Sequence, residues 1–132
     1  MENKPITIYG SGDQTRSFQY VSDLVTGLIS LMESDYTQPV NIGNPEERSI
    51  NTFATLIRDM VGSDSKVVHK PAVEDDPQRR RPDITTAKKV LGWSPKVSIE
   101  KGLEKTIQYF RKELGRTVDS EKHNGDATEY VL

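Results

Sequence analysis

Three consecutive arginines lie between two prolines in Pro77-Gln78-Arg79-Arg80-Arg81-Pro82-Asp83-Ile84. Prolines restrict the backbone, and dense positive charge in a restricted loop predicts an anion site. A second candidate anion contact, Arg16, lies far upstream, behind the turn Gly10-Ser11-Gly12. A guanidinium presents a planar fork of donors that matches phosphate oxygens. We therefore predict a fold that brings the two arginine segments together to clamp a diphosphate.

The acidic residues around the arginine loop support an alternative interpretation of the same charges. Asp75 and Asp76 precede the loop, and Asp83 follows it. In this alternative the arginines pair with these carboxylates and with solvent, and they bind no ligand. Asp75 and Asp76 could also form an acid/base pair, but the adjacent arginines favour simple neutralisation. The residue pattern alone leaves the clamp and the ion pairs both open.

Length and composition place bounds on the class of protein. The 132 residues suffice for one domain with a modest core. The net charge of −2 provides no global basic field for nucleic acid. The chain has no cysteine, which excludes disulfides and thiolate chemistry. No apolar run approaches the roughly 20 residues that a membrane span needs.

Hydrophobic periodicity predicts a small α/β unit of short strands and amphipathic helices. One apolar stripe at helical spacing consists of Val21, Leu24, Val25, Leu28 and Met32. We expect strands at 6–9, 16–20, 40–44 and 66–69, and helices at 22–32, 50–61, 84–91 and 99–114. The expected caps are Ser49, Asp83 and Ser98, and the expected helix ends are Gly62 and Gly92. The strands are so short that we expect them to complete a larger fold.

No catalytic set is visible in the sequence. Ser/His/Asp combinations, metal-ligand spacings and a Tyr-x-x-x-Lys pair are absent. The Gly10-x-Gly12 pair lacks the third glycine of a dinucleotide loop, so a turn that needs positive φ is the better interpretation. His69, at the end of an expected strand, is interpreted as structural or surface.

The C-terminal residues 115–132 are polar and lack periodicity. We predict a disordered tail there, which leaves 1–114 as the folded part. The final residues Tyr130-Val131-Leu132 could bind a PDZ-type groove. A non-catalytic interaction or regulatory chain therefore remains as one alternative function.

Several separate motifs, in the right order, carry a family resemblance. The run from Ile6 to Leu24, with Gly10-Ser11-Gly12-x-Gln14-Thr15-Arg16-x-Phe18-Gln19-Tyr20-Val21-x-Asp23, resembles the extended short-chain dehydrogenase/reductases that act on nucleotide sugars. Pro39–Glu47, Asp75–Ile84 and Leu91-Gly92-Trp93 make it more similar to the UDP-glucuronate decarboxylases (UDP-xylose synthases) of animals. The resemblance runs from about Lys4 to Glu113 and covers only the C-terminal lobe of such enzymes.

The resemblance implies a UDP-sugar site in this lobe. The backbone of Thr7 and Tyr9 would meet the uracil edge, and Arg16 would contact the diphosphate or ribose. Arg80 matches the second diphosphate arginine, and Asp83 would orient it or touch the ribose. Arg79 and Arg81 are expected to be peripheral. Two weaker candidates near the nucleotide are Gln14 and Gln19.

The resemblance also implies a reaction that this chain cannot complete alone. In the family, tightly bound NAD oxidises C4 of the glucuronate, the keto acid loses CO2, and NADH reduces the product to UDP-xylose. A Rossmann half holds NAD and carries the Tyr-x-x-x-Lys pair, and we expect both to be missing here, so that the chain is inactive alone. A homodimer in the Golgi membrane, facing the lumen, is implied for full-length animal members. This chain, without an anchor, is expected to be soluble and cytoplasmic as expressed. A UDP-sugar 4-epimerase or 4,6-dehydratase is the enzymatic alternative.

Overall fold

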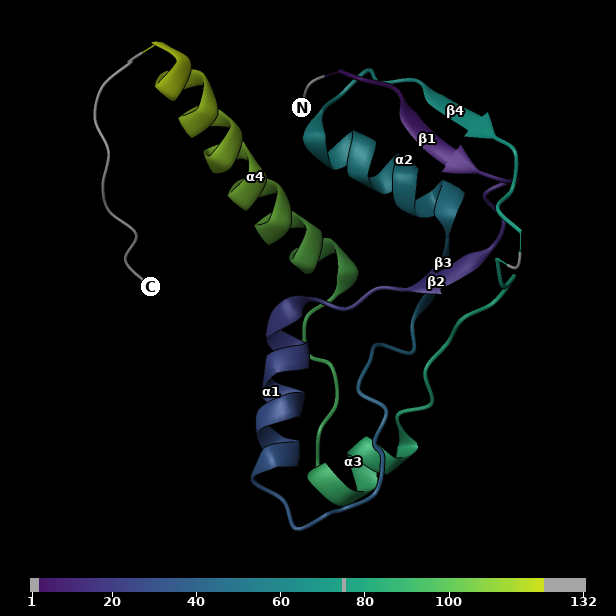
Figure 1. Ribbon diagram of the computed structural model, residues 1–132, viewed down its shortest axis with the longest axis vertical. Coiled ribbons are helices and arrows are strands. Elements are labelled where there is room, and N and C mark those ends of the chain that lie inside the picture. Colours follow the sequence, from purple (N-terminus) through teal and green to yellow (C-terminus); the bar gives the residue numbers. More distant parts are fainter. Residues whose placement is uncertain (1–2, 75, 123–132) are drawn as a thin grey trace.

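The computed structural model describes residues 3–74 and 76–122. Along these residues, strands and helices follow in the order β1, β2, α1, β3, α2, β4, α3, α4 (Figure 1). The predicted small α/β fold is confirmed. Its elements form two clusters, which are joined by the segments around residues 39–46 and 71–84 (Figure 1).

The first cluster contains a two-stranded parallel sheet and a helix. β1 (Ile6–Tyr9) pairs with β4 (Val67–Lys70), and α2 (Ile50–Val61) packs against β1. The predicted ends of α2 are confirmed: the Ser49 side chain accepts a hydrogen bond from Thr52 N, and Gly62 adopts the left-handed conformation. Local capping signals therefore sufficed to place this helix.

A second pair of strands is antiparallel and contains Arg16, the upstream arginine of the predicted anion site. β2 (Thr15–Ser17) pairs with β3 (Glu47–Ser49), with Arg16 opposite Arg48. The predicted strand at 40–44 is wrong, because the structure has no strand there. Strands exist only when a neighbour accepts their ladder of hydrogen bonds, and within the described residues no backbone of another segment bonds to 40–44. Ile42 instead packs against the second cluster.

The second cluster is built around Trp93. α1 (Val21–Met32) and α3 (Thr85–Leu91) lie side by side, and Ile84, Ala87 and Trp93 form a buried core with Val40, Ile42 and Leu91 packed against it. The Trp93 indole donates to Asp23 O at 3.1 Å. Asp23 Oδ2 accepts the backbone N–H groups of Lys96 and Val97 at 3.0 and 2.9 Å. These bonds fasten α1 to the segment that leads into the last helix.

That last helix, α4 (Ile99–Lys122), begins at the predicted cap, because Lys101 N donates to Ser98 Oγ at 3.2 Å. It continues past Leu114, so 115–122 are helical, and they were expected to be disordered. The rest of the predicted tail, 123–132, lies outside the described residues. Among the helices of the described residues, none has the length and apolar character to cross a bilayer.

The apolar stripe of α1 faces solvent. Val21, Val25 and Leu28 are 61%, 47% and 46% exposed, and Met32 is 84% exposed. The side of α1 that is buried in the chain contains Asp23 and Gly27. A Cβ on Gly27 would lie 2.7 Å from Ile42 and 3.1 Å from Trp93, so this close approach requires glycine. The 3.6-residue period of apolar residues predicted α1 correctly. Which face of α1 is buried depends on the elements that pack against it, and the period does not specify these.

Candidate functional site

The arginine loop runs beside β2. Thr15 N donates to Gln78 O at 2.9 Å, and Ser17 Oγ donates to Arg80 O at 3.2 Å. The two bonds are two residues apart on both segments, so the loop follows β2 in a parallel sense, like a partial third strand. The predicted juxtaposition of the two arginine segments is therefore confirmed, although 61 residues separate Arg16 from Pro77.

Arg16 is held by the loop that it meets. Its Nη1 donates to Thr15 O at 2.6 Å and to Pro77 O at 2.8 Å, and its Nη2 forms an ion pair with Asp76. For this arginine the ion-pair alternative describes the structure. Asp75, the other carboxylate of that alternative, lies outside the described residues. The backbone carbonyls fix the guanidinium in place, and a carboxylate occupies the side where an anion would bind.

Arg79 forms the most complete ion pair of the loop. Its Nε and Nη2 donate to both carboxylate oxygens of Glu47 at 2.6–3.0 Å. Glu47 Oε1 also accepts the Thr15 hydroxyl at 2.8 Å. The hydrogen bonds from Arg79, followed by that from Thr15, lower the pKa of Glu47. Sequence reasoning missed Glu47, because its approach to the loop depends on the pairing of β3 with β2.

Arg80 differs from its neighbour. Its side chain is exposed and makes no hydrogen bond or ion pair with the described residues, while its carbonyl is bonded to β2. A guanidinium on a fixed backbone that bonds to none of the described residues can bind an anion without first losing one of them as a partner. Of the two arginines predicted to form the clamp, Arg16 is engaged by the described part of the chain and Arg80 is not.

Asp83 is used by the helix that follows it. Its Oδ1 accepts Thr85 N at 2.9 Å and Thr85 Oγ1 at 2.6 Å, and these bonds lower the pKa of the Asp83 carboxyl. The predicted cap of α3 is off by one residue, because the N-cap is Ile84 and makes no side-chain cap bond. Asp83 lies just before it and bonds to Thr85, the first residue of the helix. No hydrogen bond joins Asp83 to Arg80 among the described residues, so the orienting role inferred for it stays a prediction.

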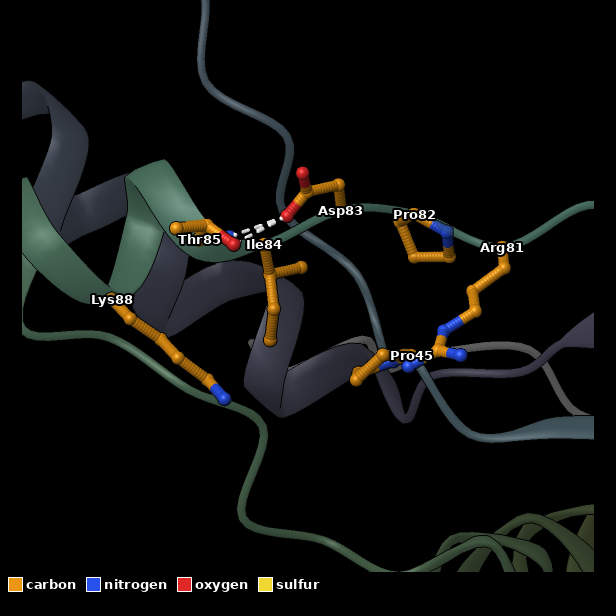
Figure 2. Close-up of a pocket in the computed structure, with 7 residues that line it drawn as sticks. All are labelled: Pro45, Arg81, Pro82, Asp83, Ile84, Thr85 and Lys88. Atoms are coloured by element: carbon orange, nitrogen blue, oxygen red, sulfur yellow. Dashed lines mark hydrogen bonds between the residues drawn. The ribbon is translucent and has the colours of Figure 1, made fainter.

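A cavity of about 280 Å³ lies at the C-terminal end of the loop. Figure 2 shows the Ile84 side chain between those of Arg81 and Lys88, with the Asp83 carboxylate bonded to Thr85. The lining combines prolines and Ile84 with two cations. Its full set of residues is Pro45, Arg81, Pro82, Asp83, Ile84, Thr85 and Lys88.

The predicted uracil edge is one side of β1. Ile6 N and Gly10 N donate to Lys66 O and Lys70 O of the neighbouring segment. Because backbone groups alternate between the two edges of a strand, those of Thr7 and Tyr9 point to the opposite edge. Tyr9 O accepts the Gln14 side chain at 2.8 Å. In the described sheet no strand pairs on this edge of β1, and the contact with uracil stays a prediction.

The two glutamines predicted as weaker contacts lie in different places. Gln14 is buried, and its amide holds Tyr9 O. Gln19 lines an apolar cavity of about 220 Å³ between α2 and α4, beside the stacked rings of Phe18 and Phe53. Its Nε2 is buried and finds no acceptor among the described residues. The structure therefore does not bring Gln14 and Gln19 to a common surface.

Comparison with known proteins identifies the family. Residues 1–106 match the model of the family described as GDP-mannose 4,6 dehydratase. The chain is 59% identical over 114 residues to UDP-glucuronic acid decarboxylase 1 of Danio rerio, covering 86% of this chain and 27% of that protein. It is 45% identical over 114 residues to UDP-glucuronic acid decarboxylase 4 of Arabidopsis thaliana, covering 86% and 26%. The chain belongs to the extended short-chain dehydrogenase/reductase family.

Solved structures of this extended family share the fold. UDP-glucose 4-epimerase of Thermotoga maritima, solved with UDP-glucose, superposes with a TM-score of 0.82 at 37% identity, covering 85% of this chain and 36% of that chain. UDP-glucuronic acid 4-epimerase of Bacillus cereus, solved with UDP-glucuronic acid and NAD, gives 0.79 at 31%, covering 85% and 37%. The chain thus spans about a quarter of the length of the curated relatives that it matches.

The residues described here do not fit the NAD that enzymes of this extended family use. Gly10 and Gly12 have φ of +76° and +80°, which confirms the turn. The turn leads into β2 and not into a helix N-terminus, where a pyrophosphate would bind. A Cβ on Gly12 would lie 2.1 Å from Asn51 Oδ1, so a side chain of the protein already occupies the concave side.

Proposed function

We propose that this chain is the UDP-sugar-binding part of a UDP-glucuronate decarboxylase. The identity of 59% to a vertebrate decarboxylase supports this reaction over others of the family. The proposed contacts are Arg16 and Arg80 with the diphosphate, and the edge of β1 at Thr7 and Tyr9, which no described strand pairs with, with uracil. Asp83 supports the loop through its bonds to Thr85 at the start of α3.

The observation that carries the proposal is the docking of the arginine loop on β2. It fixes the backbone of Arg80 beside the segment that bears Arg16, and it leaves the Arg80 guanidinium without a partner among the described residues. A diphosphate needs charge-assisted donors from two directions, and two guanidiniums provide them. Binding requires that a phosphate oxygen replace Asp76 on Arg16, which is an exchange of one anion for another.

The part played by this chain in decarboxylation is positioning. Binding energy from a remote handle, such as UDP, can be used to orient the reacting sugar. Bound NAD would supply the oxidation and reduction, and in longer relatives it would be held outside the residues described here. We therefore expect the isolated chain to release no CO2 from UDP-glucuronate in the presence of NAD. Release of CO2 by the purified chain would contradict this assignment.

The first test of the proposal is a titration of the whole chain with UDP and with uridine, followed by NMR. We expect weak binding of UDP, with a Kd of about 1 mM, because the proposed contacts are few and lie on an exposed surface. Uridine, which lacks the diphosphate, should bind at least about tenfold more weakly, since it loses the charge-assisted bonds. ADP serves as the control for the base. Equal affinity for UDP and uridine, or no response to either, would overturn the proposal.

A UDP-sugar 4-epimerase is the second candidate. It is favoured by the structural comparison, in which the Thermotoga UDP-glucose 4-epimerase gives a TM-score of 0.82. Both kinds of enzyme bind a UDP-sugar, so a measurement of UDP binding does not distinguish a decarboxylase from an epimerase. The two activities can be distinguished by the product that a longer protein containing this part forms, because only the decarboxylase yields a pentose. A homodimer and a Golgi lumenal setting are further inferences for such a longer protein, and they rest on the resemblance.

A further inference from the structure

The Glu47–Arg79 pair differs from an ordinary surface salt bridge. The Glu47 side chain is only 13% exposed, whereas that of Arg79 is 70% exposed. Three hydrogen bonds join them, and the pair is bidentate. Glu47 itself is fixed, because it lies in β3 opposite Ser17 and also accepts the Thr15 hydroxyl. The exposed arginine loop is thereby attached to a carboxylate that β3 holds in place.

This attachment acts on the residue next to Arg79. Carbonyl oxygens of Gln78 and Arg80, on both sides of Arg79, accept hydrogen bonds from β2. The Arg79 side chain is bonded to Glu47, whereas the adjacent Arg80 side chain is exposed and bonds to none of the described residues. A fixed Arg79, between two carbonyls bonded to β2, restricts the backbone from which the Arg80 side chain extends.

We infer that Glu47, acting through Arg79, is a positioning residue for the diphosphate contact of Arg80. The inference rests on the proposed UDP site and adds to it a residue that touches no ligand. It also changes the role of Arg79, which the sequence suggested was peripheral. Pre-orientation of a binding group improves affinity by lowering the ordering cost of binding.

Two physical effects of Glu47 predict opposite results, which makes the inference testable. If Glu47 acted only through its charge, replacing it with neutral glutamine would strengthen binding of an anion, because Arg79 would no longer be neutralised. If Glu47 positions Arg80, the same change weakens binding, because glutamine cannot provide the bidentate carboxylate that the Arg79 fork needs.

The experiment is a double-mutant cycle of Glu47→Gln and Arg80→Ala in the whole chain, with UDP as the probe in NMR titrations at constant ionic strength. We expect Glu47→Gln to weaken UDP binding about three- to tenfold, and to have no further effect once Arg80 is alanine. Arg79→Lys, which keeps the charge but loses the fork, should weaken binding similarly. Reversal of the pair, Glu47→Arg with Arg79→Glu, should restore part of the affinity.

Unchanged or tighter binding by Glu47→Gln would overturn the inference, as would an equal loss in the Arg80→Ala background. Circular dichroism of each variant verifies folding, and Arg79→Lys decides the matter if Glu47→Gln does not fold. Failure of the proposed function gives a different result from failure of the positioning role. If wild type and Arg80→Ala do not differ, the UDP site itself is wrong, whereas a loss in Arg80→Ala with none in Glu47→Gln refutes only the positioning role.

Discussion

Three adjacent arginines have three different environments, although their sequence context is nearly the same. Arg79 is bonded to Glu47, Arg80 has no partner among the described residues, and Arg81 lines the cavity beside Asp83. The sequence singled out Arg80 by its spacing to Asp83 within the family motif. It could not show that Arg79 is engaged, because the partner is 32 residues away and is brought close by strand pairing.

At the residue scale, Asp23 provides a stability prediction. It is 5% exposed, and its Oδ2 accepts two backbone N–H groups, from Lys96 and Val97. Asp23→Ala should lower the free energy of unfolding by about 2 kcal/mol, because two part-buried backbone donors lose a buried acceptor. Asp23→Asn, which keeps a carbonyl oxygen, should cost less. Urea denaturation measures both, and equal losses would contradict this account of the site.

At the scale of the element, the helices were predicted well because their signals are local. Ser49, Gly62, Gly92 and Ser98 cap or end helices as expected, and Asp83 lies one residue before the N-cap of α3. The predicted strand at 40–44 failed because a strand depends on a neighbour that its own residues do not specify. The end of α4 was missed because residues 115–122 lack an apolar stripe, and a helix can continue without one.

The bonds from Thr85 to Asp83 at the start of α3 make a prediction about pH. The pKa of Asp83 is lowered in the folded chain, first by the Thr85 hydroxyl, so its ionised form stabilises the fold. This contribution is fully present above the unfolded pKa, near pH 4, and is lost as the pH falls through the lower folded value. Asp83→Ala should therefore lower Tm at pH 7, and the difference from wild type should narrow as the pH falls below the unfolded pKa, near pH 4. A difference that is constant with pH, in melts followed by circular dichroism, would contradict this role of Asp83.

At the scale of the whole molecule, the structure consists of two clusters joined by the loop that carries the site. The periodic stripe of α1 is exposed, and residues 40–44 find no strand partner within the described part of the chain. That the strands complete a larger fold stays a prediction. The chain covers 27% of the length of the Danio rerio relative, and in a longer protein of this family the covered surfaces would depend on its other segments and not on local sequence.

The central claim is that Arg80 binds the diphosphate of a UDP-sugar. Its most direct test is the UDP affinity of Arg80→Ala in the whole chain, measured by NMR titration beside Arg58→Ala, which removes the same charge from a surface site on α2. We predict that Arg80→Ala weakens UDP binding by at least about tenfold, the loss of one charge-assisted contact, and that Arg58→Ala leaves it unchanged. Equal affinity of Arg80→Ala and wild type for UDP would contradict the claim.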